Sequence, residues 1–234
     1  MSFKSALVAA SLALLATGTA QAALVVSSSV GGAPNAAGVV RDNLDWLTLG
    51  SGGGVSPHTG MTLSFSGNAQ AVQGSSSTYA PPFLSGGNGA GFGSPNQANG
   101  PDATTYISAG SAGAVGGSAV TMLLSGDYLY FGLLWGSVDD YNTLSFYDGA
   151  MFVGSITGAQ VLGSPTGNQG VNGTVYVNIV SDMVFDRVVA TSSQFAFEFD
   201  NIALSRSNPI PEPGLLALLG LGLAGVAVAR RRRA

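Results

Sequence analysis

Cysteine is absent from this chain of 234 residues, and histidine occurs once, as His58. Without thiols the chain forms no disulfides, iron–sulfur clusters or cysteine zinc sites, so its own core or a bound metal must hold the fold. A Ser/His/Asp triad needs a histidine between a carboxylate and an activated serine, yet His58 lies in a glycine-rich loop and no G-x-S-x-G sequence occurs. We therefore expect His58 to be a solvated loop residue.

Basic residues are scarce outside the two ends of the chain. Between residues 23 and 208 there are three arginines, no lysine and eleven acidic residues, a formal charge of −8. This balance excludes the basic surface that nucleic-acid binding requires. An acidic surface suits an exported protein instead, and it attracts divalent cations.

Helical periodicity is also lacking between the two ends, apart from a weak helical turn near residues 42–47. Strand signals dominate instead: apolar and polar residues alternate with a period of two, and turn residues at 125–127, 147–149 and 172–173 separate the runs. The predicted strands are residues 61–65, 119–124, 128–135, 144–147, 151–156, 175–179, 184–190 and 195–200. Many short strands at this spacing predict one all-β domain over residues 23–207, an antiparallel β-sandwich of the jelly-roll type.

Three features refine this prediction. Residues 85–117 contain ten glycines among 33 residues, so few side chains can build a core there, and we expect a long mobile excursion or irregular meander with one edge strand near residues 101–108. In the final run of phenylalanines, Asp200 is expected to end the alternating strand and Asn201 to turn the chain or cap the sheet edge. Trp135 follows the parity of its apolar strand, so we expect it in the core.

The first 22 residues have the layout of a secretory signal peptide. Lys4 supplies a positive start, and residues 6–16 form an apolar run that is too short to span a membrane. Ala20-Gln21-Ala22 then matches a cleavage site. We expect Ala23 to be the first residue of the exported protein.

The last stretch begins with Pro211, Glu212 and Pro213 and continues with fifteen uncharged residues, 215–229. It closes with four arginines: Arg230, Arg231, Arg232 and Arg233. Fifteen helical residues span about 22 Å, short of the bilayer core of about 30 Å, so this is a marginal transmembrane helix. The arginines would extend toward the headgroups and stop the helix on the cytoplasmic side. The prolines that follow Asn208 are expected to form a stiff spacer.

This order of a Pro-Glu-Pro, an apolar helix and an arginine cluster resembles the PEP-CTERM sorting signal of exosortase-processed bacterial surface proteins. Residues 130–149 and 197–203 are also similar to stretches of such proteins. The resemblance implies that residues 208–234 are a sorting signal, that a membrane-embedded exosortase recognises residues 211–213, and that the tail is then removed. The helix 215–229 would hold the protein in the membrane only before this step.

Candidate binding residues lie at the predicted strand ends between residues 127 and 148. Calcium binds oxygen atoms of Asp, Asn and backbone carbonyls, and an aromatic ring beside such acids is typical of sugar-binding surfaces. The candidates for a glycan or calcium site are Asp127, Asp139, Asp140, Tyr141 and Asp148. The alternative is that these acids are solvated turn residues. Calcium is the one cofactor that these residues suggest, and no metal ligand set is assigned.

Pairs of carboxyl groups are the remaining candidates for catalysis. Glycoside hydrolases use two such groups about 5–10 Å apart. Nothing in the spacing of Glu198, Asp200 and the other acids divides them into an acid and a base, so no catalytic residue is assigned. We expect a non-enzymatic, exported protein of the cell surface or extracellular matrix whose β-domain binds exopolysaccharide. A self-associating component of a biofilm or sheath is the alternative, and a secreted glycan hydrolase is the third hypothesis.

Overall fold

The computed structural model describes residues 23–29, 31–94, 98–110, 117–194 and 196–210. The predicted signal peptide, the Pro-Glu-Pro sequence, the helix 215–229 and the four arginines lie outside these residues. Within the described residues there is no helix that is long and apolar enough to cross a membrane.

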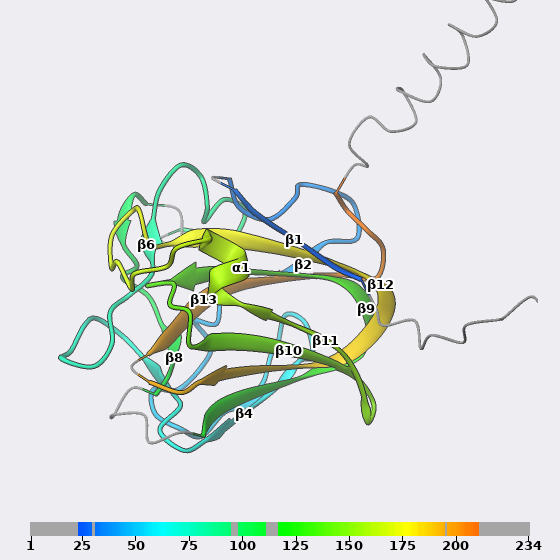
Figure 1. The fold of residues 1–234 in the computed structure, drawn as a ribbon, viewed down its shortest axis with the longest axis horizontal. Coiled ribbons are helices and arrows are strands. Elements are labelled where there is room, and N and C mark those ends of the chain that lie inside the picture. Colours follow the sequence, from blue (N-terminus) through cyan, green and yellow to red (C-terminus); the bar gives the residue numbers. More distant parts are fainter. Residues whose placement is uncertain (1–22, 30, 95–97, 111–116, 195, 211–234) are drawn as a thin grey trace, which may run out of the picture.

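The regular structure of the described chain consists of strands and one short helix, joined by long loops (Figure 1). In chain order the elements are β1 (Leu24–Ser29), β2 (Val40–Asp42), β3 (Gly54–Val55), β4 (Thr62–Ser66), β5 (Gln70–Val72), β6 (Phe83–Leu84), β7 (Gly100–Pro101), β8 (Tyr106–Ala109), β9 (Ser118–Gly136), β10 (Asn142–Asp148), β11 (Met151–Thr157), α1 (Gly158–Leu162), β12 (Val175–Ser192) and β13 (Phe197–Ser205). Eleven strands form one antiparallel sheet with the central order β11-β10-β12-β9-β13-β8-β5, and β6 pairs with β7. The prediction of an all-β, antiparallel fold is confirmed.

Two long strands, β9 and β12, organise this sheet. They pair along two stretches, residues 130–135 with 175–180 and residues 118–123 with 187–192. β1 and β13 flank the first stretch, whereas β10 and β4 flank the second. Both strands bend between the two stretches, so the sheet folds back over itself (Figure 1). The predicted turn at residues 125–127 is therefore wrong: β9 bends there without ending, because β12 bends with it and Tyr128 stays paired with Phe185.

The main hydrophobic core lies between the folded-over parts of the sheet. The ring of Phe146 on β10 lies 5.8 Å from that of Phe131 on β9 and 5.1 Å from that of Phe185 on β12. Edge-to-face contacts of this kind stabilise aromatic cores. Trp135 is fully buried in the same core and stacks on Phe197 at 4.3 Å, as its parity in the sequence predicted.

A second, smaller core covers the opposite face of the sheet. Its buried residues are Leu84, Phe92, Tyr130, Leu134, Tyr176 and Ala203. The alternation along β12 explains the division, because Val177 and Ile179 join the main core whereas Tyr176 joins the second one. Phe92 comes from the glycine-rich stretch and lies 5.9 Å from the Tyr176 ring. That stretch is irregular, as expected, but it also covers the sheet.

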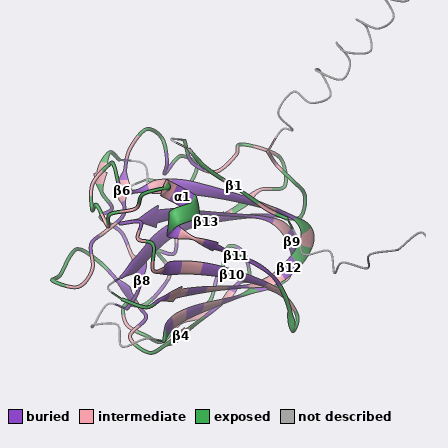
Figure 2. Ribbon diagram, in the orientation of Figure 1, coloured by how far each residue is buried: buried purple, intermediate pink, exposed green. Residues whose placement is uncertain are grey.

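β13 is buried along its whole length, as Figure 2 shows. The prediction that Asp200 ends this strand and that Asn201 turns the chain or caps an edge is wrong. Asn201 adopts a left-handed φ of 53° within a bulge, and the strand continues to Ser205. The predicted edge strand near residues 101–108 is also wrong, because β8 pairs with β13 on one side and β5 on the other.

Candidate functional site

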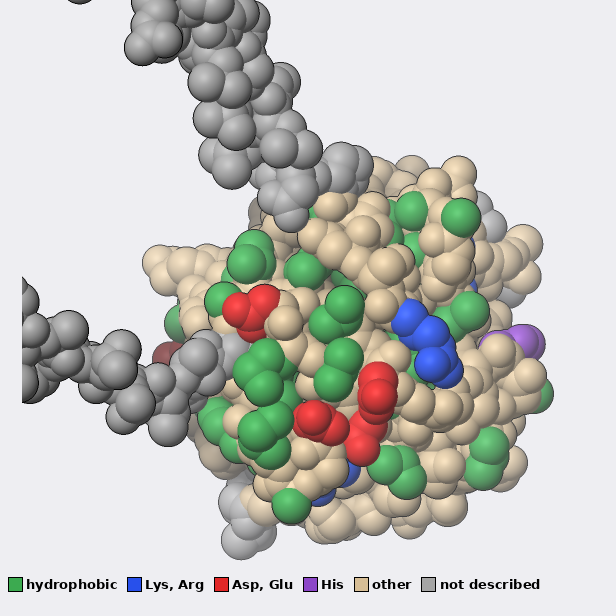
Figure 3. Space-filling view, turned by 90° about the vertical axis from the view of Figure 1, so that its right-hand side faces the viewer, with side chains coloured by type: hydrophobic (Ala, Val, Ile, Leu, Met, Phe, Trp, Pro, Cys, Tyr) green, Lys and Arg blue, Asp and Glu red, His purple; other side chains and the backbone are tan. Residues whose placement is uncertain are grey.

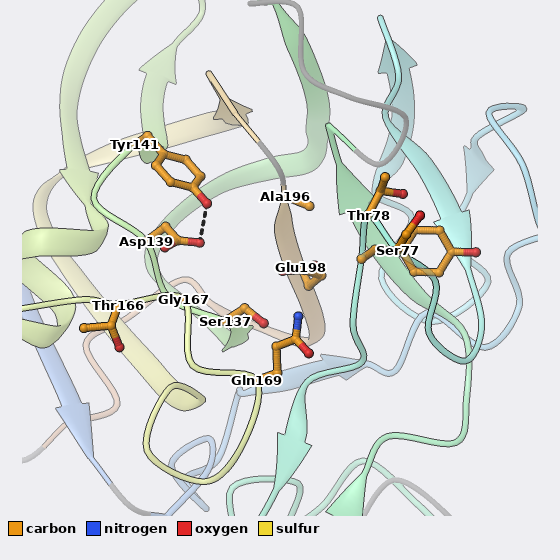
Figure 4. A pocket seen from close by; sticks show the side chains of 11 residues that line it. Ser77, Thr78, Ser137, Asp139, Tyr141, Thr166, Gly167, Gln169, Ala196 and Glu198 are labelled. Carbon is orange, nitrogen blue, oxygen red and sulfur yellow. Dashed lines mark hydrogen bonds between the residues drawn. The ribbon is translucent and has the colours of Figure 1, made fainter.

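Four segments that are distant in the sequence meet around one open pocket of about 240 Å³, which we name the Glu198 pocket (Figure 4). They are the β5–β6 loop, the corner after β9, the loop between α1 and β12, and the start of β13. The lining residues are Ser77, Thr78, Tyr79, Ser137, Asp139, Tyr141, Thr166, Gly167, Gln169, Ala196 and Glu198. Most of them carry hydroxyl, amide or carboxyl groups, so the pocket is polar.

The corner after β9 fixes the position of Asp139. Ser137 has a left-handed φ of 43°, and the next side chain, Val138, is buried in the main core. The Val138 amide donates to the Gly173 carbonyl at 2.9 Å, and the Val138 carbonyl accepts from the Gly167 amide at 3.0 Å. A Cβ atom on Gly167 would lie 2.7 Å from Asp139 Oδ1, so this close approach of the loop requires glycine.

Asp139 and Tyr141 form a hydrogen-bonded pair in the pocket wall. The Tyr141 hydroxyl donates to Asp139 Oδ2 at 2.6 Å (Figure 4). Burial raises the pKa of Asp139, and the hydrogen bond from Tyr141 offsets part of this rise. Burial and the hydrogen bond to Asp139 raise the pKa of Tyr141. The tyrosine therefore keeps its proton and holds the carboxyl group in place.

Glu198 enters the pocket from β13 and is only 3% exposed. The Ala80 amide donates to its Oε1 at 3.1 Å, while Oε2 lacks a well-formed hydrogen bond with the residues that the structure describes. Burial raises the pKa of Glu198 to about 8, and the charge of Asp139 adds to the rise, whereas the hydrogen bond from the Ala80 amide opposes it. Glu198 is thus a protonated carboxyl group at neutral pH.

We predict that Glu198 makes the domain less stable as the pH rises. Between the ordinary pKa of 4.5 and the folded value of about 8, the folded chain holds a proton that the unfolded chain releases. The free energy of unfolding should therefore fall by up to about 1.4 kcal/mol per pH unit in this window and level off above it. Urea denaturation over a range of pH, followed by tryptophan fluorescence, measures the effect. Glu198→Gln should lack this slope and exceed the wild type in stability at alkaline pH; parallel curves would contradict the prediction.

The structure separates the other candidate residues from this pocket. Asp140 follows Asp139 but is exposed and does not line the pocket. Asp148 ends β10, about 20 Å along the strand from its first residue at an extended rise of about 3.4 Å. Asp127 is exposed at the bend of β9. Of the five candidates, the structure therefore brings only Asp139 and Tyr141 together in the pocket.

None of the described residues that line the Glu198 pocket is a histidine. Among the described residues, no group of three or more His, Cys, Asp and Glu side chains gathers where it could hold a metal ion. His58 is exposed in its loop, as expected. Apart from Asp139 and Tyr141, sequence reasoning missed the residues that line the pocket; Tyr79 and Gln169, for example, come from loops without any periodic pattern. They can be identified only from the structure, in which the four segments meet around the pocket.

One comparison with known proteins identifies the C-terminal segment. The family model of the PEP-CTERM protein-sorting motif matches residues 209–233. The chain carries a PEP-CTERM protein-sorting motif. The resemblance that the sequence suggested is confirmed, and the motif marks an exported, cell-envelope-associated protein that is sorted by an exosortase. No curated protein and no solved structure matches the chain.

The PEP-CTERM motif begins against the β-domain. Ile210, the second residue of the matched segment, packs on the second core. Its amide donates to Asn208 Oδ1 at 2.9 Å. The expected spacer after Asn208 is therefore docked on the domain as far as Ile210, and Pro211 follows directly.

Proposed function

We propose that the β-domain is a non-catalytic module that binds exopolysaccharide in the Glu198 pocket, outside the cell membrane. One observation carries the proposal: Asp139, Tyr141, Gln169 and Glu198 converge from three distant segments on one open, polar pocket (Figure 4). Binding sites for small molecules typically place a few such polar groups around a concave space to fix the orientation of the ligand.

The groups in the pocket complement the hydroxyls of a sugar. A carboxylate at Asp139 accepts hydrogen bonds, and the Gln169 amide both donates and accepts them. The rings of Tyr79 and Tyr141 add apolar faces that end in a polar tip. Because about 240 Å³ is less than the roughly 300–1,000 Å³ of pockets for drug-sized ligands, we expect the pocket to take a single sugar unit or a short branch.

We expect Asp139→Ala to weaken the binding of exopolysaccharide purified from the source bacterium by about tenfold to a hundredfold. Hydrogen bonds to a charged group contribute about 1.5–3 kcal/mol, and each 1.4 kcal/mol changes the affinity about tenfold. The measurement is the Kd of the protein for immobilised exopolysaccharide. The matched control is Asp140→Ala, which removes an exposed acid one residue away and should bind like the wild type. Equal affinity of all three proteins would exclude this site.

A secreted glycan hydrolase is the competing use of the same pocket, since Asp139 and Glu198 are two carboxyl groups with raised pKa values. Binding is favoured because Glu198 is almost fully buried and the Ala80 amide engages one of its oxygens. Little of the carboxyl group is left to reach a glycosidic oxygen. New reducing ends that the wild type releases and Glu198→Gln does not would favour the enzymatic hypothesis.

Self-association as a biofilm or sheath component is the second candidate function, and a row of exposed and half-buried side chains favours it. Phe152, Tyr147, Arg187 and Leu123 stand opposite one another on the adjacent strands β11, β10, β12 and β9. Phe152 and Leu123 are 47% and 50% exposed. Figure 3 shows hydrophobic side chains among charged ones at this end of the molecule. Concentration-dependent sedimentation that Phe152→Ser abolishes, without polysaccharide binding, would favour this function.

We also propose that residues 1–22 are removed on export and that the exosortase then removes the tail, which delivers the domain to the cell surface or extracellular matrix. The Ala23 amide donates to the Asp182 carboxylate at 2.8 Å, which supports the first step. Cleavage before Ala23 would replace this amide by an ammonium group and give a charge-assisted hydrogen bond. The marginal length of the predicted helix 215–229 suits a transient anchor.

The architecture proposed for the domain is a jelly-roll-like sandwich. The position of the main core between the folded-over parts of the sheet supports two layers. The contact of Phe146 on β10 with Phe131 on β9 joins the inner faces of these layers, as in sheet-on-sheet packing.

A further inference from the structure

A pair of buried aspartates joins an irregular loop to the centre of the sheet. Asp200 on β13 is fully buried, and Asp102, in the loop between β7 and β8, is 2% exposed. Their carboxyl groups contact each other. Neither residue lines the Glu198 pocket, and the proposed polysaccharide site does not use them.

Asn201 follows Asp200 directly, at the bulge in β13. Asp200 stands opposite Leu134 of β9, which belongs to the second core, so its side chain projects away from the main core. The next two residues, Asn201 and Ile202, together stand opposite Leu133. Asn201 is fully buried, and its side-chain amide lacks a well-formed hydrogen bond with the described residues.

Four oxygen atoms of these three residues lack a well-formed hydrogen bond with any described residue: Asp102 Oδ2, Asp200 Oδ1, Asp200 Oδ2 and Asn201 Oδ1. The other oxygen of Asp102 accepts from the amide and the hydroxyl of Thr104 at 2.8 and 2.6 Å, which fixes the orientation of its carboxyl group. A buried polar group without a partner is costly, and a charged one more so. The four oxygens therefore require a positive partner.

The charges that act on Asp200 make this requirement stronger. Those recorded among the described residues come from Asp102 and Asp45, and both are acidic. A shared proton would satisfy a single contact between the two carboxyl groups. A divalent cation would balance both charges and take all four oxygens as ligands.

We propose that Asp102, Asp200 and Asn201 bind one calcium ion. Calcium takes about six to eight oxygen ligands in flexible geometry, and carboxylates, amide carbonyls, backbone carbonyls and water all serve. Magnesium demands near-ideal octahedral geometry, and softer metals select nitrogen or sulfur ligands, which this set lacks. The site is separate from the calcium candidates at Asp127, Asp139, Asp140 and Asp148. The ion ties the β7–β8 loop to β13.

The test is calcium binding by the full chain in detergent after treatment with a chelator. Titration with calcium chloride should show one ion per chain, with a Kd of about 10⁻³ M or tighter, as in extracellular calcium modules. The temperature of unfolding should rise as calcium is added, because the ion binds the folded state.

Three variants locate the ion. Asp200→Asn should lose calcium binding and the calcium-dependent shift in unfolding temperature. In calcium-free buffer this variant should unfold at the wild-type temperature or above it, because it removes one of two like charges in contact, and this result also shows that it folds. Asp102→Asn should give the same results as Asp200→Asn. It serves as the test variant if Asp200→Asn does not fold. Asp127→Asn, at an exposed position, should respond to calcium like the wild type.

Two results would overturn the proposal. A wild-type chain that binds no calcium and unfolds at the same temperature with and without it would leave the aspartates as a pair that shares a proton. A calcium response that survives in both Asp200→Asn and Asp102→Asn would place the ion elsewhere. Asp139→Ala should keep the calcium response while it loses polysaccharide affinity, so the two proposals fail independently.

Discussion

Replacing Glu212 by glutamine should leave the C-terminal tail attached and abolish delivery of the protein to the cell surface. Glu212 is the only acidic residue in the segment 209–233 that the PEP-CTERM motif covers. Glutamine keeps the size of the side chain but removes its charge, and charge-assisted hydrogen bonds are about twice as strong as neutral ones. We therefore expect an exosortase that recognises Pro211-Glu212-Pro213 to leave most of the chain unprocessed.

The measurement is an immunoblot of cell fractions with an epitope placed after Ala234. The wild type should lose the epitope on sorting, whereas the Glu212→Gln protein should retain it and stay in the membrane fraction. Ser207→Ala, two residues before the matched segment, is the control and should be processed normally. Processing and surface delivery of Glu212→Gln at the wild-type level would refute recognition through this carboxylate.

Replacing Trp135 by alanine should lower the free energy of unfolding by about 3–5 kcal/mol, the usual cost of deleting a large aromatic side chain from a core. Trp135 is fully buried, belongs to the main core and stacks on Phe197 at 4.3 Å. Few residues can move into the space, because Trp135 sits on β9 between the partner strands β12 and β13. A loss of this size is a large part of the total stability of an ordinary domain.

Urea denaturation followed by circular dichroism measures this change. Trp135→Phe keeps an aromatic ring against Phe197 and should cost clearly less than the alanine variant. Folded Trp135→Phe protein should bind exopolysaccharide like the wild type, because Trp135 does not line the Glu198 pocket. Loss of binding with unchanged stability would mean that Trp135 is a sugar-stacking residue and not a core residue.

The strands were predictable because a period of two reports directly on which side chains share a face. The alternation of Val177 and Ile179 with Tyr176 predicted both the strand and its division between two faces. The bend at residues 125–127 was not predictable, since serine, glycine and aspartate also form turns, and only the paired bend of β12 keeps β9 continuous. α1 is five residues long, too short for a helical period to appear.

The burial of the second face was the main feature that the sequence concealed. Acidic residues between the phenylalanines of β13 indicate a strand with one face in water, yet Glu198 and Asp200 are 3% and 0% exposed. Loops cover this face: the Ala80 amide contacts Glu198, and Asp102 contacts Asp200. Alternation shows which residues share a face, but it cannot show what a distant loop places upon that face.

Some residues of the Glu198 pocket could be predicted from the sequence, and others could not. Asp139 and Tyr141 were predictable as candidates because they lie two residues apart in one corner beside an aromatic strand. Glu198 and Gln169 join them only through the fold, since β13 and the loop before β12 approach the corner from far along the chain. The loop between α1 and β12 packs closely against the corner after β9 at Gly167, and this close approach sets the distance between the two segments. No sequence pattern predicts it.

Hydrogen–deuterium exchange of the protein with and without purified exopolysaccharide tests the proposed binding site most directly. Slower exchange is predicted in the segments that line the Glu198 pocket, residues 77–79, 137–141, 166–169 and 196–198. The hairpin between β10 and β11 should exchange at the same rate in both samples. Unchanged exchange in all four segments, or protection confined to the hairpin, would contradict binding in the Glu198 pocket.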